Sequence, residues 1–259
     1  MDRPLFLFGV LSASLAAAIP ARAADAASPV PDLVLANHIL AHEQIVDGYG
    51  HVSVRNPADA NRYFLARSMA PALVTAADVM SYDLDSNPLD ANGRVSYAER
   101  FIHGAIYKAR PDVMSVVHAH TPSVIPFGVS AVRLQPIFHM AAFLGAGVPV
   151  FEIRDTGGPA TDLLVKNAAL GDALARTLGS ANVALMRGHG MVTVGMSIPQ
   201  AVYRAYYTAQ DAQLEAEALR LGTPNFLTAA EARSATQTQA GLVSRAWDLW
   251  ARAVSGGGG

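Results

Sequence analysis

The sequence predicts a single-domain protein of the α/β class, in which helices and strands alternate along the chain. Of its 259 residues, 51% are hydrophobic, which is enough to bury one large core. Segments with the period of an amphipathic helix are interleaved with short segments that alternate as strands do. No linker-like stretch interrupts the middle of the chain. We therefore expect one domain over residues 32–255.

The domain begins with a predicted helix and a β-hairpin. Apolar residues recur at four- and seven-residue spacing over residues 32–46, and Asp47-Gly48 ends this amphipathic helix. Residues 48–55 alternate like a strand after a glycine turn, and residues 62–66 read as its hairpin partner.

The rest of the domain continues this alternation. Ser96 and Glu99 have the spacing of a capping box, which predicts a helix that Arg110-Pro111 ends. The other predicted strands are 79–84, 113–117, 148–153 and 183–186, and the other predicted helices are 162–178, 198–221 and 228–254.

The N-terminus has the organisation of a secretory signal peptide over residues 1–23. Arg3 precedes an apolar, alanine-rich run, and Ala21-Arg22-Ala23 supplies a small-x-small cleavage site. The run is too short for a stable membrane span, although an uncleaved anchor is the alternative interpretation. We expect export to the periplasm or secretion, with residues 24–31 as a linker and the glycines at 256–259 as a flexible tail.

Charge and cysteine content exclude several functions. The formal net charge is −2, and it becomes −3 once residues 1–23 are removed, because that segment holds one acidic and two basic residues. This balance does not suit nucleic acid binding, and no membrane partner is expected after signal cleavage. The chain has no cysteine. Export therefore brings no disulfide, and metal ligands must be His, Asp or Glu.

Two histidines stand where a predicted strand ends. If residues 113–118 are extended, the two-residue period places His118 and His120 on one face, where two imidazoles can reach one divalent cation. His189 lies between two glycines that let the backbone pass close to such a site. Glu99 opens the preceding helix, so a carboxylate can stand near a metal whose ligands are all neutral. The sequence therefore predicts a metal half-site at His118 and His120 that His189 would complete, and two same-face histidines without a metal are the alternative.

The order of these residues resembles the class II aldolase/adducin family. Glu99 is followed nineteen residues later by His118-x-His120 and, after an apolar run, by His189-Gly190. The resemblance covers residues 32–221. It implies a three-layer α/β/α fold around a central, mostly antiparallel sheet. It also implies a homotetramer with active sites at subunit boundaries, where a C-terminal tyrosine of a neighbouring subunit, such as Tyr203 or Tyr207, is a candidate contributor.

The same resemblance suggests roles for residues around the metal. It implies that Glu99 is the acid/base catalyst, whereas the capping box offers a purely structural alternative. His103 lies one helical turn after Glu99, where it either supports its neighbours or touches substrate. His139 begins an apolar helical segment that resembles the decarboxylase branch of the family, and it is either a substrate-binding or a core histidine.

The substrate side of the predicted site differs from that of sugar-phosphate aldolases. Where those relatives carry a phosphate-cradling threonine and glycine, this chain has Arg67-Ser68, and His51 replaces their usual asparagine. Tyr97 and Ala98 replace the two serines that precede the glutamate in phosphate-binding relatives. A guanidinium matches a carboxylate bidentately. We therefore expect these positions to bind a small-molecule carboxylate.

Two of these positions have structural alternatives. His51 could be a turn residue that bonds backbone groups. Arg67 could be a surface arginine paired with Asp78 or Asp83.

Aldol cleavage and decarboxylation need the same electronics, because each generates an enolate-like oxyanion that a metal stabilises while Glu99 moves the proton. Since the pocket favours a carboxylate, we predict a metal-dependent carbon–carbon lyase that decarboxylates a small hydroxy-aromatic, pyridine or semialdehyde carboxylate. Zinc or manganese is the expected cofactor, and three imidazoles also suit iron or cobalt. The alternatives are an aldolase acting on a non-phosphorylated hydroxy-keto acid, a non-haem iron oxygenase, and an adducin-like protein without enzymatic activity.

Overall fold

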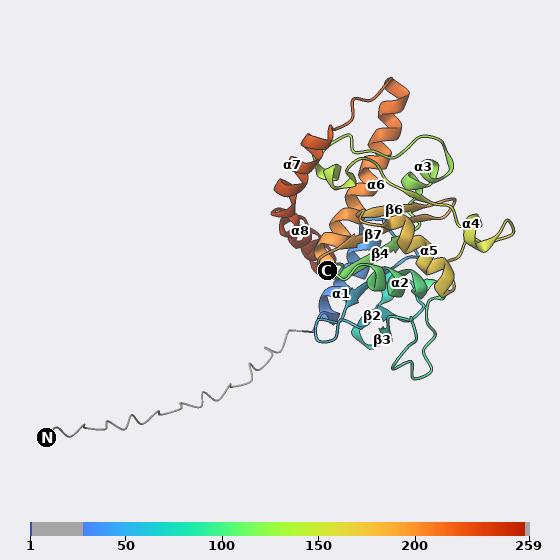
Figure 1. Cartoon of the computed structure of the whole chain (residues 1–259), viewed down its shortest axis with the longest axis vertical. Coiled ribbons are helices and arrows are strands. Elements are labelled where there is room, and N and C mark those ends of the chain that lie inside the picture. The colour runs from blue at the N-terminus through green and yellow to red at the C-terminus, as the bar shows by residue number, and fades with distance from the viewer. Residues whose placement is uncertain (2–27, 257–259) are drawn as a thin grey trace.

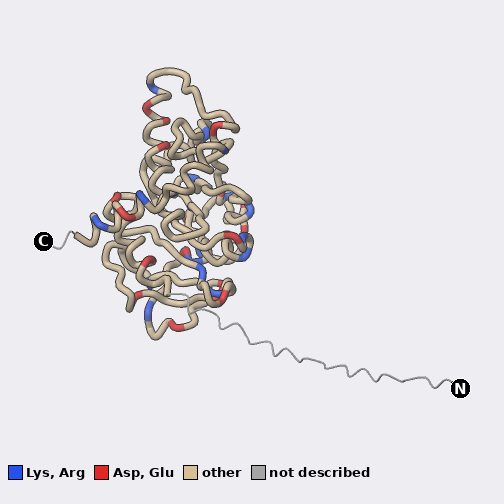
Figure 2. The backbone as a smooth tube through the Cα atoms, turned by 90° about the vertical axis from the view of Figure 1, so that its left-hand side faces the viewer, with Lys and Arg blue, Asp and Glu red and all other residues tan. Residues whose placement is uncertain are grey.

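The structure, a computed structural model, describes Met1 and residues 28–256. The expected signal peptide, the first half of the expected linker and the last three glycines fall outside this range. No helix in the described part of the chain is both long enough and apolar enough to cross a bilayer. Lys and Arg residues are interspersed with Asp and Glu residues around the fold (Figure 2).

A seven-stranded sheet forms the centre of the fold, in the order β3-β2-β1-β4-β7-β6-β5. Neighbouring strands are antiparallel except β5 and β6, which are parallel. The predicted, mostly antiparallel sheet is therefore confirmed. The strands are β1 (His51–Arg55), β2 (Arg62–Ala66), β3 (Val79–Asp83), β4 (Ser115–Ala119), β5 (Val150–Phe151), β6 (Val183–Met186) and β7 (Gly190–Gly195).

Helices cover both faces of this sheet and complete three layers (Figure 1). The α-helices are α1 (Val30–His42), α2 (Phe101–Ala109), α3 (Ile125–Val129), α4 (Arg154–Gly157), α5 (Ala168–Leu178), α6 (Ile198–Leu221), α7 (Ala229–Ala240) and α8 (Val243–Gly256). The 3-10 helices are η1 (Pro71–Leu73), η2 (Ala76–Asp78), η3 (Ala98–Arg100), η4 (Pro122–Val124) and η5 (His139–Leu144).

Each face of the sheet has its own apolar core. One core lies between the sheet and helices α1, α6 and α8, and the other lies between the sheet and helices α2 and α5. Neighbouring residues of β4 contribute to opposite cores: Val116 belongs to the α2 side and Val117 to the α6 side. This explains why all five residues of this central strand are buried. The carboxyl end of β4 is consequently held from both faces, which gives the two histidines there a rigid support.

Several predicted elements have different boundaries in the structure, among them the first helix, which is predicted over 32–46 and spans Val30–His42. The predicted helix at 162–178 begins only at Ala168, because Asn167 caps it by accepting a 3.0 Å hydrogen bond from the Leu170 amide. The predicted helical stretch at 228–254 is two helices, α7 and α8, separated at Gly241. The predicted strand at 148–153 is reduced to Val150–Phe151. Strand β7 is an additional strand that the sequence pattern does not predict.

Candidate active site

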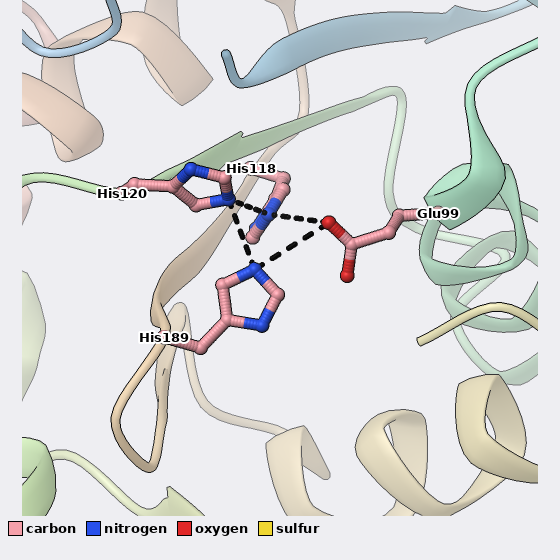
Figure 3. A group of neighbouring side chains, drawn as sticks. All are labelled: Glu99, His118, His120 and His189. Atoms are coloured by element: carbon pink, nitrogen blue, oxygen red, sulfur yellow. Dashed lines mark hydrogen bonds and ion pairs between the residues drawn. The ribbon is translucent and has the colours of Figure 1, made fainter. Parts of the chain in front are cut away.

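Three imidazoles and one carboxylate converge where strands β4 and β7 meet. His118 lies in β4, His120 directly follows it, and His189 lies in the turn between β6 and β7. Glu99 lies in η3, immediately before α2. Figure 3 shows the four side chains pointing toward one another from these separate elements. The predicted convergence of the three histidines is therefore present in the fold.

The ring nitrogens lie at the spacing of ligands that share one ion. The Nε2 atom of His120 is 3.0 Å from Nε2 of His118 and 2.9 Å from Nε2 of His189. Two nitrogens that bind one ion at about 2.0–2.1 Å and subtend about 90–109° are about 2.9–3.4 Å apart. The spacing of the three rings therefore suits ligands of one ion.

Backbone carbonyls determine the tautomers of two of these rings. Nδ1 of His118 lies 3.1 Å from the Met191 oxygen, and Nδ1 of His189 lies 2.8 Å from the Leu163 oxygen. Because a carbonyl oxygen can only accept, each Nδ1 carries the proton, and in the neutral ring each Nε2 presents a lone pair. Lone pairs directed at one point repel unless a cation lies between them. The donor set therefore fits a divalent metal ion.

The hairpin that carries His189 depends on two glycines. Gly188 has φ +63°, a conformation that residues with a side chain rarely adopt. A Cβ atom on Gly190 would lie 2.1 Å from the carbonyl oxygen of Ala119, so no side chain fits there. The prediction that these glycines let the backbone pass tightly beside the metal site is confirmed.

Glu99 is an ionised carboxylate directed at the three nitrogens. It is only 7% exposed. Its Oε1 accepts a 2.9 Å hydrogen bond from the Val165 amide, and its Oε2 lies 3.4 Å from Nε2 of both His118 and His189. Burial alone raises the pKa of the carboxyl, but the two histidines outweigh it and hold the pKa well below its ordinary value. Oε2 is thus placed both for proton transfer and as a possible fourth ligand.

The predicted capping box at Ser96 and Glu99 is wrong. No side chain caps η3, and the Ser96 hydroxyl instead accepts a 3.0 Å hydrogen bond from the Tyr82 hydroxyl. Glu99 has a non-helical backbone, with φ −90° and ψ 16°. This conformation turns its carboxylate toward the histidines and away from the helix start. The structural alternative for Glu99 is thereby removed.

The segment between α4 and α5 supplies two backbone groups to the site. The Leu163 carbonyl orients His189, and the Val165 amide orients Glu99. Leu163 has φ +68°, a left-handed conformation that costs about 1 kcal/mol for a residue with a side chain. Sequence reasoning misses these contacts and predicts helix here, because a backbone group acting on a distant side chain leaves no residue-type signal.

His51 lies beside the three converging histidines. In the pairing of β1 with β4 it stands directly opposite His118, with the two ring centroids 5.1 Å apart, and the Tyr97 ring packs 4.5 Å from it. Burial lowers the pKa of His51 well below its ordinary value, and His103 and His118 lower it further. His51 is therefore a neutral strand residue and does not have the alternative turn role.

Arg67 and Ser68 directly follow β2, which is separated from β4 by β1. Nε of Arg67 donates a 2.6 Å hydrogen bond to Asp78, whose pKa falls to about 2 through hydrogen bonds from Thr75 and Arg67. Ser68 is exposed, and its amide donates to the Val95 carbonyl. The ion pair with Asp78 is one of the two roles open to Arg67. It engages Nε and leaves both Nη atoms without a partner among the described residues.

His139 is not brought to the three histidines. It is an exposed residue of η5, and none of its described contacts joins it to Glu99 or to the metal site. It instead lines a cavity of about 400 Å³ whose walls include aromatic residues of α6 and α8, namely Tyr203, Tyr206, Tyr207 and Trp250. Within one chain, the structure therefore places this histidine at a separate cavity and not beside the three converging histidines.

Comparison with known proteins agrees with this fold. The sequence model of the family described as Class II Aldolase and Adducin N-terminal domain matches residues 31–216. The chain is 37% identical over 256 residues to Decarboxylase tropJ of Talaromyces stipitatus, across 90% of this chain and 96% of that protein. It is 31% identical over 188 residues to 3,4-dihydroxyphthalate decarboxylase of Arthrobacter keyseri, across 67% of this chain and 71% of that protein.

A solved structure shares the architecture. The aldolase II superfamily protein from Pseudomonas syringae matches with a TM-score of 0.74 at 21% identity, over 88% of this chain and 92% of that chain. The match to the family model over residues 31–216 and the 37% identical relative show that the protein belongs to the class II aldolase/adducin family. The predicted similarity to the decarboxylase branch is confirmed by the decarboxylases among its relatives, which support a lyase role.

Proposed function

We propose that this protein is a metal-dependent decarboxylase of a small hydroxy-aromatic carboxylate. The observation that carries the proposal is the convergence of three imidazole nitrogens with the ionised carboxylate of Glu99. The similarity to Decarboxylase tropJ and to 3,4-dihydroxyphthalate decarboxylase supports decarboxylation over aldol cleavage. Pyridine and semialdehyde carboxylates remain within the same chemical class, because they too delocalise the electron pair that carbon dioxide leaves behind.

His118, His120 and His189 would hold the cation, for which zinc or manganese suits three imidazoles, as do iron and cobalt. When bound, the ion would supply a Lewis acid that stabilises negative charge on a substrate oxygen. The rest of the chemistry belongs to side chains of this protein.

Glu99 moves the proton. Because it is ionised, its Oε2 can take the proton from the substrate hydroxyl. Glu99 passes this proton to the ring carbon that carries the carboxylate, and the negative charge on the oxygen compensates for the loss of aromaticity. The carbon–carbon bond to the carboxylate then breaks, carbon dioxide leaves, and the bonding electron pair restores the aromatic ring, whose oxygen regains a proton from solvent. The hydrogen bond from the Val165 amide keeps Oε1 in place while Oε2 reacts.

Arg67 and His51 would position the substrate. Asp78 accepts a hydrogen bond from Nε of Arg67 and so fixes the guanidinium group. The two Nη atoms of Arg67 can then bind a carboxylate bidentately. A carboxylate that stays on the product suits this contact best, because the departing group loses its charge in the transition state and strong binding of it would slow the reaction. A substrate with two carboxylates fits this arrangement.

The proposal is tested by stripping the protein with a chelator, restoring zinc, manganese, iron(II) or cobalt singly, and measuring carbon dioxide released from hydroxylated benzoates and phthalates. We expect release that depends on the restored metal and stops again on chelation. Efficient cleavage of a hydroxy-keto acid or of a sugar phosphate, without carbon dioxide release, would contradict it and support the aldolase alternative.

We also propose that the protein is exported and acts as a homotetramer. The family resemblance supports this assembly, and exposed apolar side chains near the site and on the outer helices offer contact surface, among them Tyr49, Leu221 and Leu249. Light scattering should give about four times the mass of one mature chain. An active species with the mass of one chain at every dilution would contradict it.

A further inference from the structure

A continuous row of buried polar groups leads away from His51. Nδ1 of His51 lies 2.7 Å from Nε2 of His103, and Nδ1 of His103 lies 2.6 Å from the Ser53 hydroxyl. The Ser53 hydroxyl is in turn 2.7 Å from the Tyr107 hydroxyl. All four residues are at most 4% exposed. Since buried polar groups must satisfy one another, the position of every proton in this row can be worked out.

The assignment of donors and acceptors in this row starts at Tyr107. Burial raises the pKa of this phenol, so it is protonated and must donate. Ser53 Oγ is the only hydrogen-bond acceptor that the Tyr107 hydroxyl meets in the described part of the chain. The Ser53 hydroxyl therefore accepts from Tyr107. Its own proton must then go to Nδ1 of His103, the other group that it contacts.

The two histidines continue the row, with each group donating toward His51. Burial and the nearby His118 lower the pKa of His103 to about 3, so its ring is neutral and carries one proton. Because Nδ1 of His103 accepts from Ser53, that proton is on Nε2, and Nε2 donates to Nδ1 of His51. Nδ1 of His51 is consequently an acceptor. Since an imidazole ring keeps at least one proton and Nδ1 of His51 is occupied as an acceptor, that proton is on Nε2 of His51.

We propose that Tyr107, Ser53 and His103 are positioning residues that hold His51 in the Nε2–H tautomer, so that His51 presents a hydrogen-bond donor to the substrate carboxylate. The proton positions follow from the hydrogen bonds alone, and only the identity of the substrate rests on the proposed function. The same tautomer makes Nε2 of His51 unable to bind the metal, because it has no lone pair. His51 therefore stays a substrate group although it lies beside three metal-binding histidines.

The sequence spacing explains how the row is built. His51 and Ser53 are two residues apart and share one face of β1, whereas His103 and Tyr107 are four residues apart and share one face of α2. The polar alternation His-Val-Ser-Val-Arg in β1 is the signal that marks this face. The two elements interlock, with each polar residue of the strand contacting a polar residue of the helix.

Neutron diffraction from the deuterated, zinc-loaded protein locates these protons directly. We expect a deuteron on Nε2 of both His51 and His103 and none on Nδ1 of either ring. A deuteron on Nδ1 of His51 would overturn the proposal. The result does not depend on activity, so the correct tautomer without carbon dioxide release would refute the proposed function and leave the positioning row intact.

Variants test whether the tautomer matters to the substrate. His103→Leu removes the donor to His51 and should lower kcat/KM for a carboxylate substrate by about tenfold or more, the effect of losing one oriented hydrogen bond, with bound metal unchanged. His103→Gln supplies an amide that donates to His51 and accepts from Ser53. It should recover kcat/KM to within about threefold of wild type.

Ser115→Ala is the matched control, because Ser115 is an equally buried serine of the neighbouring strand whose hydroxyl donates to the Ser53 carbonyl outside the row. It should leave kcat/KM within about twofold of wild type. Equal losses in all three variants would show a packing role only and would overturn the proposal.

Discussion

Buried carboxylates occur in two regions of this protein and behave in opposite ways. Glu99 in the active site is 7% exposed, and Asp211 and Glu215 on α6 are fully buried. Burial raises the pKa of both α6 residues to about 7, whereas the pKa of Glu99 lies well below its ordinary value. Burial is similar in the two regions, so the difference must come from what each carboxylate faces.

The partners account for the contrast. Asp211 and Glu215 accept hydrogen bonds of 3.0 and 2.9 Å from the amides of Ile137 and Gln135, which fasten the segment before η5 to α6. One oxygen of each carboxylate has no partner within the described chain. Glu99 instead faces converging imidazoles. A buried acid that faces only backbone amides fastens structure and keeps its proton to a higher pH, whereas one that faces a cluster of imidazoles is ionised and available for chemistry.

The largest expected effect is that of His118→Ala, which removes a ligand at the centre of the active-site region. This variant should lose bound metal and decarboxylase activity together, because two remaining imidazoles hold an ion weakly. Elemental analysis and carbon dioxide release measure the two properties. His42→Ala, which changes a histidine that is half exposed, is the control and should retain both. Retention of metal by His118→Ala would break the contrast between the two regions.

Glu99→Gln should lower turnover by roughly two to four orders of magnitude, the range for loss of a positioned proton-transfer group. Glutamine keeps the shape and the acceptor for the Val165 amide, so the fold should persist. Glu215→Gln, the equivalent change in the other region, should leave turnover nearly unchanged. The metal affinity of Glu99→Gln should be measured as well. If it falls together with turnover, Oε2 of Glu99 is a fourth metal ligand. Wild-type turnover would refute the catalytic role.

Arg67→Ala should weaken binding or turnover of carboxylate substrates by about ten- to a hundredfold, with metal content unchanged, because a charged hydrogen-bonded pair contributes roughly 1.5–3 kcal/mol. Arg62→Ala is the matched control at the opposite end of β2, where the arginine pairs with Asp59. Steady-state kinetics on carboxylates and on neutral analogues distinguish a substrate-binding role of Arg67 from a structural one. Equal responses of both kinds of substrate would show that Arg67 acts only through its ion pair with Asp78.

The smallest expected effect concerns the pH dependence of stability. The pKa of Asp211 is about 7 in the folded protein and about 3.8 in a free chain, so between these values the folded state binds more protons. Stability should therefore fall as pH rises from about 4 to 7. Asp211→Asn keeps an acceptor for the Ile137 amide without the proton, and it should be more stable than wild type at pH 8 by roughly 1–3 kcal/mol.

Urea denaturation at pH 5 and pH 8 measures this difference. Asp248→Asn, which alters an exposed aspartate of α8, is the control. Its free energy of unfolding should change between pH 5 and pH 8 by as much as that of the wild-type protein. A wild-type protein that gains stability between these pH values, with Asp211→Asn behaving identically, would contradict the assignment.

Residue types and spacing predict the ligand set, the acid at the helix start and the class of fold, because these depend on side chains within short segments. The sequence does not predict the carbonyl of Leu163 or the amide of Val165, whose roles arise only when the loop before α5 folds against the histidines. The role of His103 follows from an interlocking of β1 with α2 across fifty residues. Tertiary context also excludes the capping alternative for Glu99 and the turn alternative for His51.

The most direct test of the account is a crystal structure of the metal-loaded protein. One ion should lie about 2.0–2.2 Å from Nε2 of His118, His120 and His189, with at least one further position available for substrate oxygen and with Glu99 Oε2 close to it. An ion bound elsewhere, or any one of the three rings turned away from an ion at this place, would contradict the account.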